Sequence, residues 1–96
     1  MKSIPDKNAQ VLVVDDDAGL LLLIKTTLLS AGMTEPALVS DSREAMELVR
    51  RHRFPVVLLD LNMPHVDGME LLRAIKEELP AVECIIITAV DDVETL

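Results

Sequence analysis

The 96-residue chain has one cysteine, few basic side chains and no long apolar run, and each shortage excludes a class of protein. Cys84 cannot form a disulfide within the chain, and the apolar residues Ile85–Ile87 beside it indicate a buried hydrophobic side chain rather than a reactive thiol. Nine basic against seventeen acidic side chains give a net charge of −8. We therefore expect no direct binding of nucleic acid or anionic lipid by this segment.

The sequence also lacks the apolar segments that enter or cross membranes. No apolar run approaches the ~20 residues of a membrane span, and residues 1–10 lack the apolar core of a signal peptide. We therefore expect a cytoplasmic protein. The length allows one hydrophobic core but is short for two, because an independent domain usually needs about 50 residues or more. We expect an N-terminal tail over residues 1–9 and one domain over residues 10–96.

Short apolar segments alternate with segments of helical periodicity. The predicted strands are Val11–Val14, Ala37–Val39, Val56–Leu59 and Ile85–Ile87. All but the second are nearly all apolar, which is typical of strands buried on both faces of a parallel sheet. The predicted helices are a leucine-rich segment from Leu20 to Leu29 that Gly32 ends, a segment from the capping Asp41 to His52, and Gly68–Leu79, which Pro80 ends. This alternation predicts an α/β fold with helices on both faces of a parallel sheet.

Acidic or hydroxyl side chains follow three of the predicted strands. Asp15-Asp16-Asp17 follows the first strand, Asp60 the third and Thr88 the fourth. In open parallel sheets ligand sites lie beyond the carboxyl ends of the strands, so these side chains are expected to share one crevice. Neighbouring carboxylates repel one another unless a proton or a cation offsets their charge. Oxygen ligands without a His or Cys cluster favour a hard ion, and Mg²⁺ fits best.

A carboxylate beside a divalent cation can attack phosphorus and form an acyl phosphate. Asp60 is the better candidate nucleophile, because it stands alone after Val56–Leu59. The hydroxyl of Thr88 and backbone N–H groups after Asp60 can then donate to phosphoryl oxygens. Taken singly, Asp17 is a helix N-cap, Thr88 a strand-end hydroxyl and Asn62–Pro64 a turn. Their joint position at strand ends is what favours a functional site.

Three segments resemble the receiver domains of bacterial response regulators. Val11–Asp17 resembles the family's first strand and acidic pair. Leu58–Pro64, followed by Asp67-Gly68, resembles its phosphoacceptor segment, and Ile85–Ala89 resembles its fourth strand and switch hydroxyl. The resemblance extends from about Gln10 to the last residue. It implies a flavodoxin-like, three-layer α/β/α fold whose parallel strands have the order 2-1-3-4-5 in the family.

The resemblance also implies roles for individual residues. Asp60 would be phosphorylated, and Asp16 and Asp60 would bind Mg²⁺ directly. Asp15 would help through water, the backbone carbonyl of Asn62 would complete the protein ligands, and Thr88 would sense the phosphoryl group. The implied partners are a sensor histidine kinase as phosphodonor and an output domain, in the same chain or a partner, that regulates transcription. The implied activity is a switch with slow self-phosphorylation and self-dephosphorylation, not an enzyme.

The chain departs from the family's pattern after the fourth predicted strand. The family has a lysine at the end of a fifth strand, whereas this sequence ends eight residues after Thr88, and Lys25 and Lys76 lie in predicted helices. We therefore expect an incomplete receiver, without the fifth strand and helix, whose apolar edge Cys84–Ile87 either pairs with a second copy or is part of a longer polypeptide. Asp91–Thr95 resembles the start of the fourth helix in regulators that activate sigma-54-dependent transcription.

Two other functions have specific sequence requirements. A phosphohydrolase of the haloacid dehalogenase type needs a second aspartate two residues after the nucleophile, as general acid and base, and this chain has Asn62 there. A degenerate receiver would bind partners without being phosphorylated. The presence of all the acidic positions argues against it, although the absent lysine argues for it in this segment.

Overall fold

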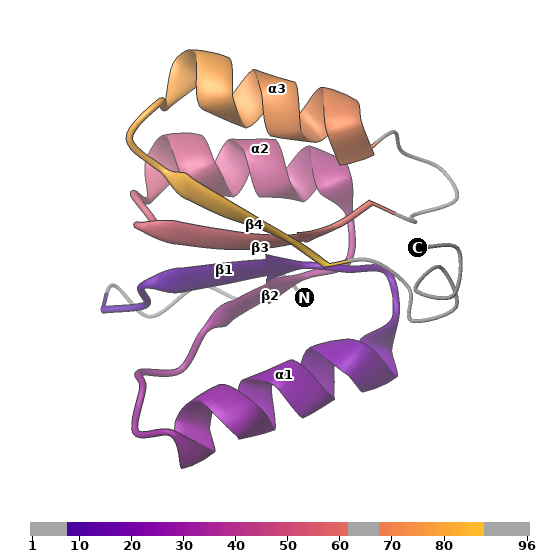
Figure 1. Ribbon diagram of the computed structural model, residues 1–96, viewed down its shortest axis with the longest axis vertical. Helices are drawn as coiled ribbons and strands as arrows, with labels where there is room; N and C mark the ends of the chain where they lie inside the picture. Colours follow the sequence, from indigo (N-terminus) through magenta and orange to yellow (C-terminus); the bar gives the residue numbers. More distant parts are fainter. Residues whose placement is uncertain (1–7, 62–67, 88–96) are drawn as a thin grey trace, which may run out of the picture.

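The computed structural model describes residues 8–61 and 68–87, which form three layers with a sheet between helices (Figure 1). The strands are β1 (Val11–Val14), β2 (Ala37–Val39), β3 (Val56–Asp60) and β4 (Glu83–Ile87). The helices are α1 (Ala18–Ser30), α2 (Ser42–Arg51) and α3 (Gly68–Glu78). The predicted α/β alternation is confirmed. Within the described residues, no helix has the length and apolar character needed to cross a membrane.

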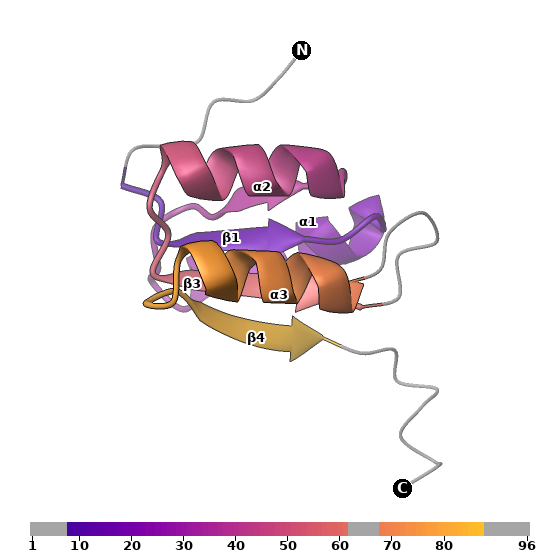
Figure 2. The same cartoon turned by 90° about the horizontal axis from the view of Figure 1, so that it is seen from above.

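The four strands are all parallel and have the order β2-β1-β3-β4. Helices α2 and α3 cover one face of the sheet, and α1 covers the other (Figure 1). Seen from above, α2 and α3 lie side by side over the strands (Figure 2). Because every strand runs in the same direction, the loops that follow β1 and β3 leave the sheet at the same edge.

The central strand β1 divides the core into two unequal parts. Leu12 and Val14 belong to the larger cluster, under α2 and α3, and Val11 and Val13 to the smaller one, which α1 covers. This division follows from the alternation of side chains along a strand. Since β1 has a hydrogen-bonded neighbour on each side and a helical layer on each face, all four of its residues are buried.

Local sequence signals set the ends of α1, as predicted. The carboxylate of Asp17 accepts hydrogen bonds from the amides of Gly19 (2.9 Å) and Leu20 (3.2 Å), which have no partner inside the helix. At the other end, Gly32 adopts a φ of 85°, and its amide donates to the carbonyl of Leu29. A side chain is rarely tolerated at such a φ, so a glycine ends the helix there.

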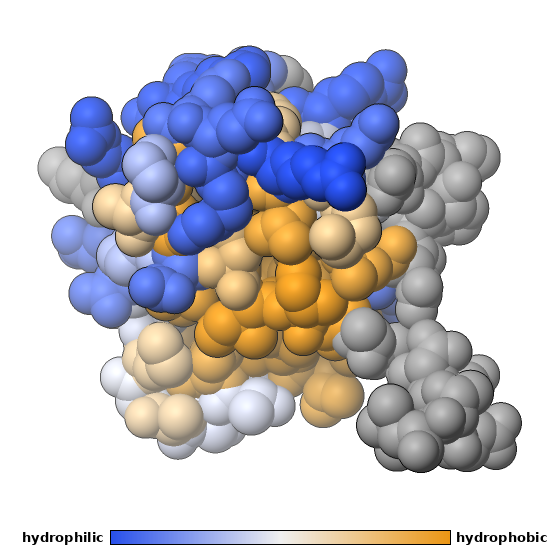
Figure 3. All heavy atoms as spheres, turned by 45° about the horizontal axis from the view of Figure 1, so that its top comes forward, coloured by the Kyte–Doolittle hydropathy of each residue, from blue (hydrophilic) through white to orange (hydrophobic). Residues whose placement is uncertain are grey.

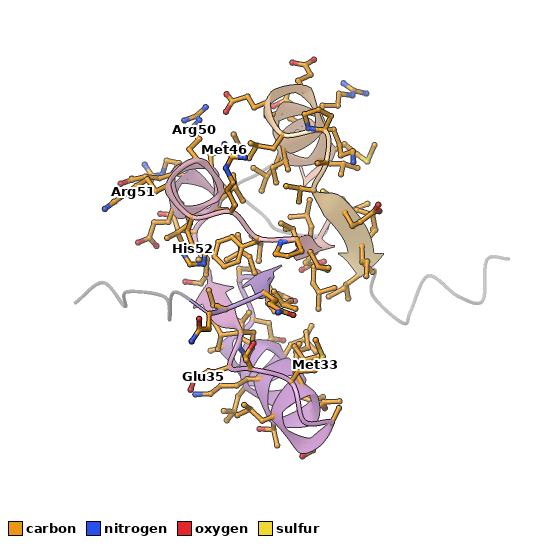
Figure 4. All side chains as sticks on the ribbon, turned by 90° about the vertical axis from the view of Figure 1, so that its left-hand side faces the viewer. Met33, Glu35, Met46, Arg50, Arg51 and His52 are labelled. Atoms are coloured by element: carbon orange, nitrogen blue, oxygen red, sulfur yellow. The ribbon has the colours of Figure 1, made fainter. Side chains whose placement is uncertain are left out.

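Hydrogen bonds and ring packing fix the far ends of α2 and α3. The guanidinium of Arg50, labelled in Figure 4, donates two hydrogen bonds of 2.8 and 2.7 Å to the carboxylate of Glu78. The half-buried ring of His52 packs on Phe54, with 4.6 Å between the ring centroids, and its Nε2 lies 3.4 Å from the carbonyl oxygen of Ala9. Ala9 is thus buried just before β1. The division into a tail over residues 1–9 and a domain over residues 10–96 stays a prediction.

Strand β4 and Cys84 are less buried than predicted. Strand β4 is not buried on both faces, since Ile85 is 52% and Ile86 36% exposed, and among the described residues only β3 pairs with it. Cys84 is half-buried, and desolvation raises the pKa of its thiol, which keeps the thiol protonated. Figure 3 shows an apolar surface below the charged outer helices. What covers this edge stays a prediction.

The leucine-rich helix α1 is only partly buried. Leu21 is the one buried side chain of this helix, while Leu23 and Leu29 are exposed. A helix contacts a sheet along one stripe only, so a helix that is apolar on all sides leaves part of its apolar surface exposed.

The core assignment predicts very different costs for two leucine truncations. We expect Leu12→Ala, at a fully buried position, to lower the free energy of unfolding by about 2–5 kcal/mol, because it leaves a cavity between sheet and helices. Leu22→Ala, at a position 61% exposed, is the matched control and should change it by less than about 0.5 kcal/mol. Urea unfolding followed by circular dichroism measures both, and equal costs would contradict the assignment.

Candidate metal centre at the carboxyl ends of β1 and β3

The register of two neighbouring strands brings the acidic segments together. Strands β1 and β3 pair in parallel, with Val11 opposite Val56 and Val14 opposite Leu59. The residues that come next in each strand direction are Asp15 and Asp60. A shift of the register by one residue would turn one of these side chains to the other face of the sheet, so their proximity depends on this pairing.

The three carboxylates of Asp15, Asp16 and Asp60 form a cluster. One carboxylate oxygen of each residue lies within 4.8 Å of the other two. Asp15 is fully buried and Asp60 is 9% exposed, whereas Asp16 is exposed. The cluster therefore has a buried side and a side open to solvent, and these three oxygens can hold a metal ion.

Asp15 is held by hydrogen bonds at its backbone and at one of its carboxylate oxygens. Its amide donates to the carbonyl of Val39 at 3.0 Å, and its Oδ1 accepts from the amide of Asp17 at 2.9 Å. The other oxygen, Oδ2, is buried, and within the described part of the chain it has no hydrogen-bond partner. A buried acceptor without a donor costs about 1–3 kcal/mol, and more when it is charged.

Burial raises the pKa of Asp15 from its ordinary value of 3.8 to about 6. Desolvation is the largest cause, and the charges of Asp60 and Asp16 raise the pKa further, while the hydrogen bond from the Asp17 amide lowers it. Removal from water disfavours the ionised form, and neighbouring negative charges do the same. A cation within reach of this carboxylate would therefore stabilise the folded protein.

Asp60 is the last residue of β3, and its backbone is held by the neighbouring strand. It lies opposite Ile87 of β4, and the amide of Leu61 donates to the carbonyl of Ile87 at 3.4 Å.

Asp17, in contrast, is absent from the acidic cluster and serves as the N-cap of α1. Its amide contact with Asp15 was missed at the level of sequence, although an Asp two residues earlier is the usual signal for such a turn.

Other predicted site residues fall outside the cluster or outside the described residues. Asn62 and Thr88 lie outside the described residues, as does the loop of residues 89–92. Among the described lysines, Lys25 pairs with Glu35 at 3.3 Å. Lys76 donates to carbonyl groups in the turn after α3. Neither lysine reaches the acidic cluster.

Comparison with known proteins relates this site to one family. Residues 11–96 match the response regulator receiver domain family. Over 88 residues, the chain is 39% identical to the transcriptional regulatory protein ZraR of Escherichia coli K12, covering 92% of this chain and 20% of ZraR. It is 32% identical over 91 residues to the chemotaxis protein CheY-3 of Vibrio cholerae, covering 93% of this chain and 70% of CheY-3. The chain thus spans about a fifth of the length of ZraR.

Solved structures agree with the sequence comparison. The receiver domain of the Francisella response regulator 1452 is similar with a TM-score of 0.77 and 32% identity, over 92% of this chain and 72% of that domain. The corresponding domain of the response regulator AraT from Geobacillus stearothermophilus has a TM-score of 0.76 and 35% identity, over 91% and 69%. The parallel sheet, the aspartates after β1 and β3 and these similarities lead to one conclusion: the chain belongs to the response regulator receiver domain family.

Proposed function

We propose that the chain is a phosphorylation switch that accepts a phosphoryl group on Asp60 from the phosphohistidine of a sensor histidine kinase, in a Mg²⁺-dependent reaction. One observation carries the proposal. The carboxylates of Asp15, Asp16 and Asp60 converge at one edge of the sheet, and Oδ2 of Asp15 is buried there without a hydrogen-bond donor from the described residues. Such an arrangement is stable only if a cation or a proton offsets the charge.

The donor set fits Mg²⁺. All of the clustered ligand atoms are carboxylate oxygens, and Mg²⁺ usually keeps several waters and takes one or two carboxylates together with phosphate oxygens. Asp16 and Asp60 would bind the ion directly and Asp15 through water, and the backbone carbonyl of Asn62, outside the described residues, would complete the site. When bound, the ion shields the charge of the incoming phosphoryl group.

Asp60 would act as the nucleophile. In the proposed transfer, one of its carboxylate oxygens forms a bond to phosphorus as the bond from phosphorus to the histidine nitrogen breaks, and the electron pair leaves with the imidazole. The burial of Asp60 at the end of β3 removes competing water from part of its surroundings. Thr88, outside the described residues, would donate a hydrogen bond to a phosphoryl oxygen. Slow hydrolysis of the acyl phosphate would reset the switch without enzymatic turnover.

Phosphorylation would alter the surface that a partner meets. Phosphorylation would replace the single negative charge of the Asp60 carboxylate by a phosphoryl group that carries about −1.5 to −2. Thr88 and the loop of residues 89–92 would move toward this group. The relatives ZraR and GlrR are transcriptional regulatory proteins. We therefore propose a cytoplasmic regulator whose output module controls transcription, in the manner of sigma-54 activators.

The acceptor assignment predicts a covalent adduct that depends on Asp60. The full-length protein incubated with acetyl phosphate and Mg²⁺ should gain the mass of one phosphoryl group, and a chelator should prevent this gain. Asp60→Asn should abolish the adduct, because an amide oxygen is a poor nucleophile. Asp17→Asn is the matched control: asparagine caps a helix as well as aspartate does, so phosphorylation should persist. An adduct of unchanged yield on Asp60→Asn would exclude Asp60 as the acceptor.

The raised pKa of Asp15 predicts a pH-dependent cost in the metal-free protein. Between pH 3.8 and about 6, the folded state binds a proton that the unfolded state releases. The free energy of unfolding therefore falls as the pH rises from 3.8 to about 6. Above about pH 6 the full cost of the buried, ionised carboxylate remains. With a chelator at pH 7, Asp15→Asn should raise the free energy of unfolding by about 1–2 kcal/mol. This gain in the free energy of unfolding should be smaller at pH 4, where Asp15 is protonated in the folded state, and in the presence of Mg²⁺, which offsets its charge.

Asp41 provides a control of opposite sign for this experiment. Hydrogen bonds from Arg43 lower the pKa of the exposed Asp41 carboxyl, so its ionised form favours folding above its ordinary pKa. Asp41→Asn should therefore lower stability slightly at pH 7, because surface pairs contribute little. Chemical denaturation at each pH measures both variants. A loss of stability for metal-free Asp15→Asn at pH 7 would contradict the raised pKa.

A further inference from the structure

We propose that Gly68 is a positioning residue for the phosphoacceptor. The absence of a side chain at the first residue of α3 lets this helix lie directly against the backbone that carries Asp60, and this contact holds the Asp60 carboxylate in the acidic cluster. The inference rests on the proposed function, because it assigns Gly68 a part in the same reaction.

The contact around Gly68 leaves no room for a Cβ atom. A Cβ added to this buried glycine would lie 2.7 Å from the Cα of Leu61, 2.9 Å from its Cδ2 and 3.1 Å from the carbonyl oxygen of Asp60. Real Cβ atoms essentially never approach another heavy atom closer than 3.0 Å. Two of these three neighbours are backbone atoms, which cannot move aside by a change of rotamer. Even alanine would therefore separate α3 from the segment Asp60–Leu61 by several tenths of an ångström.

The requirement for glycine here is steric and not conformational. Among the described residues, Gly32 is the one glycine with a positive φ, and a Cβ there would meet nothing within 4 Å. Alanine is the better helix former by up to about 1 kcal/mol, so the helix itself gains nothing from Gly68. The two glycines thus separate two effects, close approach at Gly68 and backbone strain at Gly32.

The strand end is the side of this contact that would yield. Helix α3 is anchored by the buried side chains of Leu71 and Ile75, and the paired hydrogen bonds from Arg50 hold its last turn against α2. The end of β3 is held by a longer hydrogen bond, 3.4 Å from the amide of Leu61 to the carbonyl of Ile87, than the two bonds of 2.8 and 2.7 Å that hold the last turn of α3. A side chain at position 68 would therefore displace the residues that carry the acceptor.

A displacement of this size matters for the chemistry. Metal and catalytic sites need their groups held within about 0.5 Å of the productive geometry, and a misplacement of 1 Å can cost about a hundredfold in rate. The Asp60 carboxylate is attached to the displaced backbone and would move with it. One of its oxygens lies within 4.8 Å of an oxygen of Asp15 and of Asp16, so such a movement would change these distances. Gly68 would thus act on Mg²⁺ and on the phosphoryl group through Asp60, without touching either.

Two matched glycine variants of the full-length protein test the inference. We expect Gly68→Ala to bind Mg²⁺ at least about tenfold more weakly, measured by calorimetry, and to accept phosphate from acetyl phosphate at least about tenfold more slowly. Gly32→Ala also destabilises the fold, through an unfavourable φ at the far end of α1, but both values should stay within about twofold of the parent. Chemical denaturation measures the loss of stability of each variant, which we expect to be comparable.

The outcomes distinguish this inference from the proposed function. A parent protein that neither binds Mg²⁺ nor takes up phosphate would overturn both. A parent that does both, with Gly68→Ala indistinguishable from Gly32→Ala, would overturn the role of Gly68 alone. If Gly68→Ala does not fold, it is combined with Leu61→Ala, which removes the 2.9 Å contact but keeps the backbone contact. The pair should still bind Mg²⁺ more weakly than Leu61→Ala alone, and equal binding would overturn the inference.

Discussion

The repulsion among the acidic residues at the carboxyl ends of β1 and β3 is the constraint on which the rest of this structure depends. Asp15 is fully buried next to Asp60, and its Oδ2 has no hydrogen-bond partner among the described residues. Its pKa of about 6 expresses the same cost, since the ionised carboxylate is removed from water beside another negative charge. A fold that gathers these groups gives up stability unless a ligand offsets the charge.

The remaining structure keeps these groups in place against their repulsion. Strand β1 is buried on both faces, so Asp15 begins from a rigid backbone, and the Asp17 amide fixes one of its oxygens while the Asp17 carboxylate caps α1. The pairing of Arg50 with Glu78 ties α2 to α3 at the opposite end of these helices. Rigid support behind the cluster and the exposed Asp16 on its solvent side suit the proposed phosphoryl-accepting site.

Errors in the sequence-based expectations have a common physical origin. Hydrophobic character shows that a segment can be buried, but not that a neighbour is present to bury it. The strand Ile85–Ile87 was therefore placed correctly although its burial was not, because β4 has one paired strand among the described residues. Leucines of α1 are likewise exposed, since the sheet covers one side of that helix.

The sequence alone determined the order of helices and strands, the caps at Asp17 and Gly32, and the position of aspartates at the carboxyl ends of β1 and β3. These features depend on contacts within a few residues, which propensity, turn chemistry and periodicity report. Only the tertiary structure decided the register that sets Asp15 beside Asp60, the absence of a partner for Oδ2 of Asp15 among the described residues, and the close approach of Gly68 to Leu61, where a Cβ would lie 2.7 Å from the Leu61 Cα. Each of these depends on how separate elements pack together, which local sequence patterns do not report.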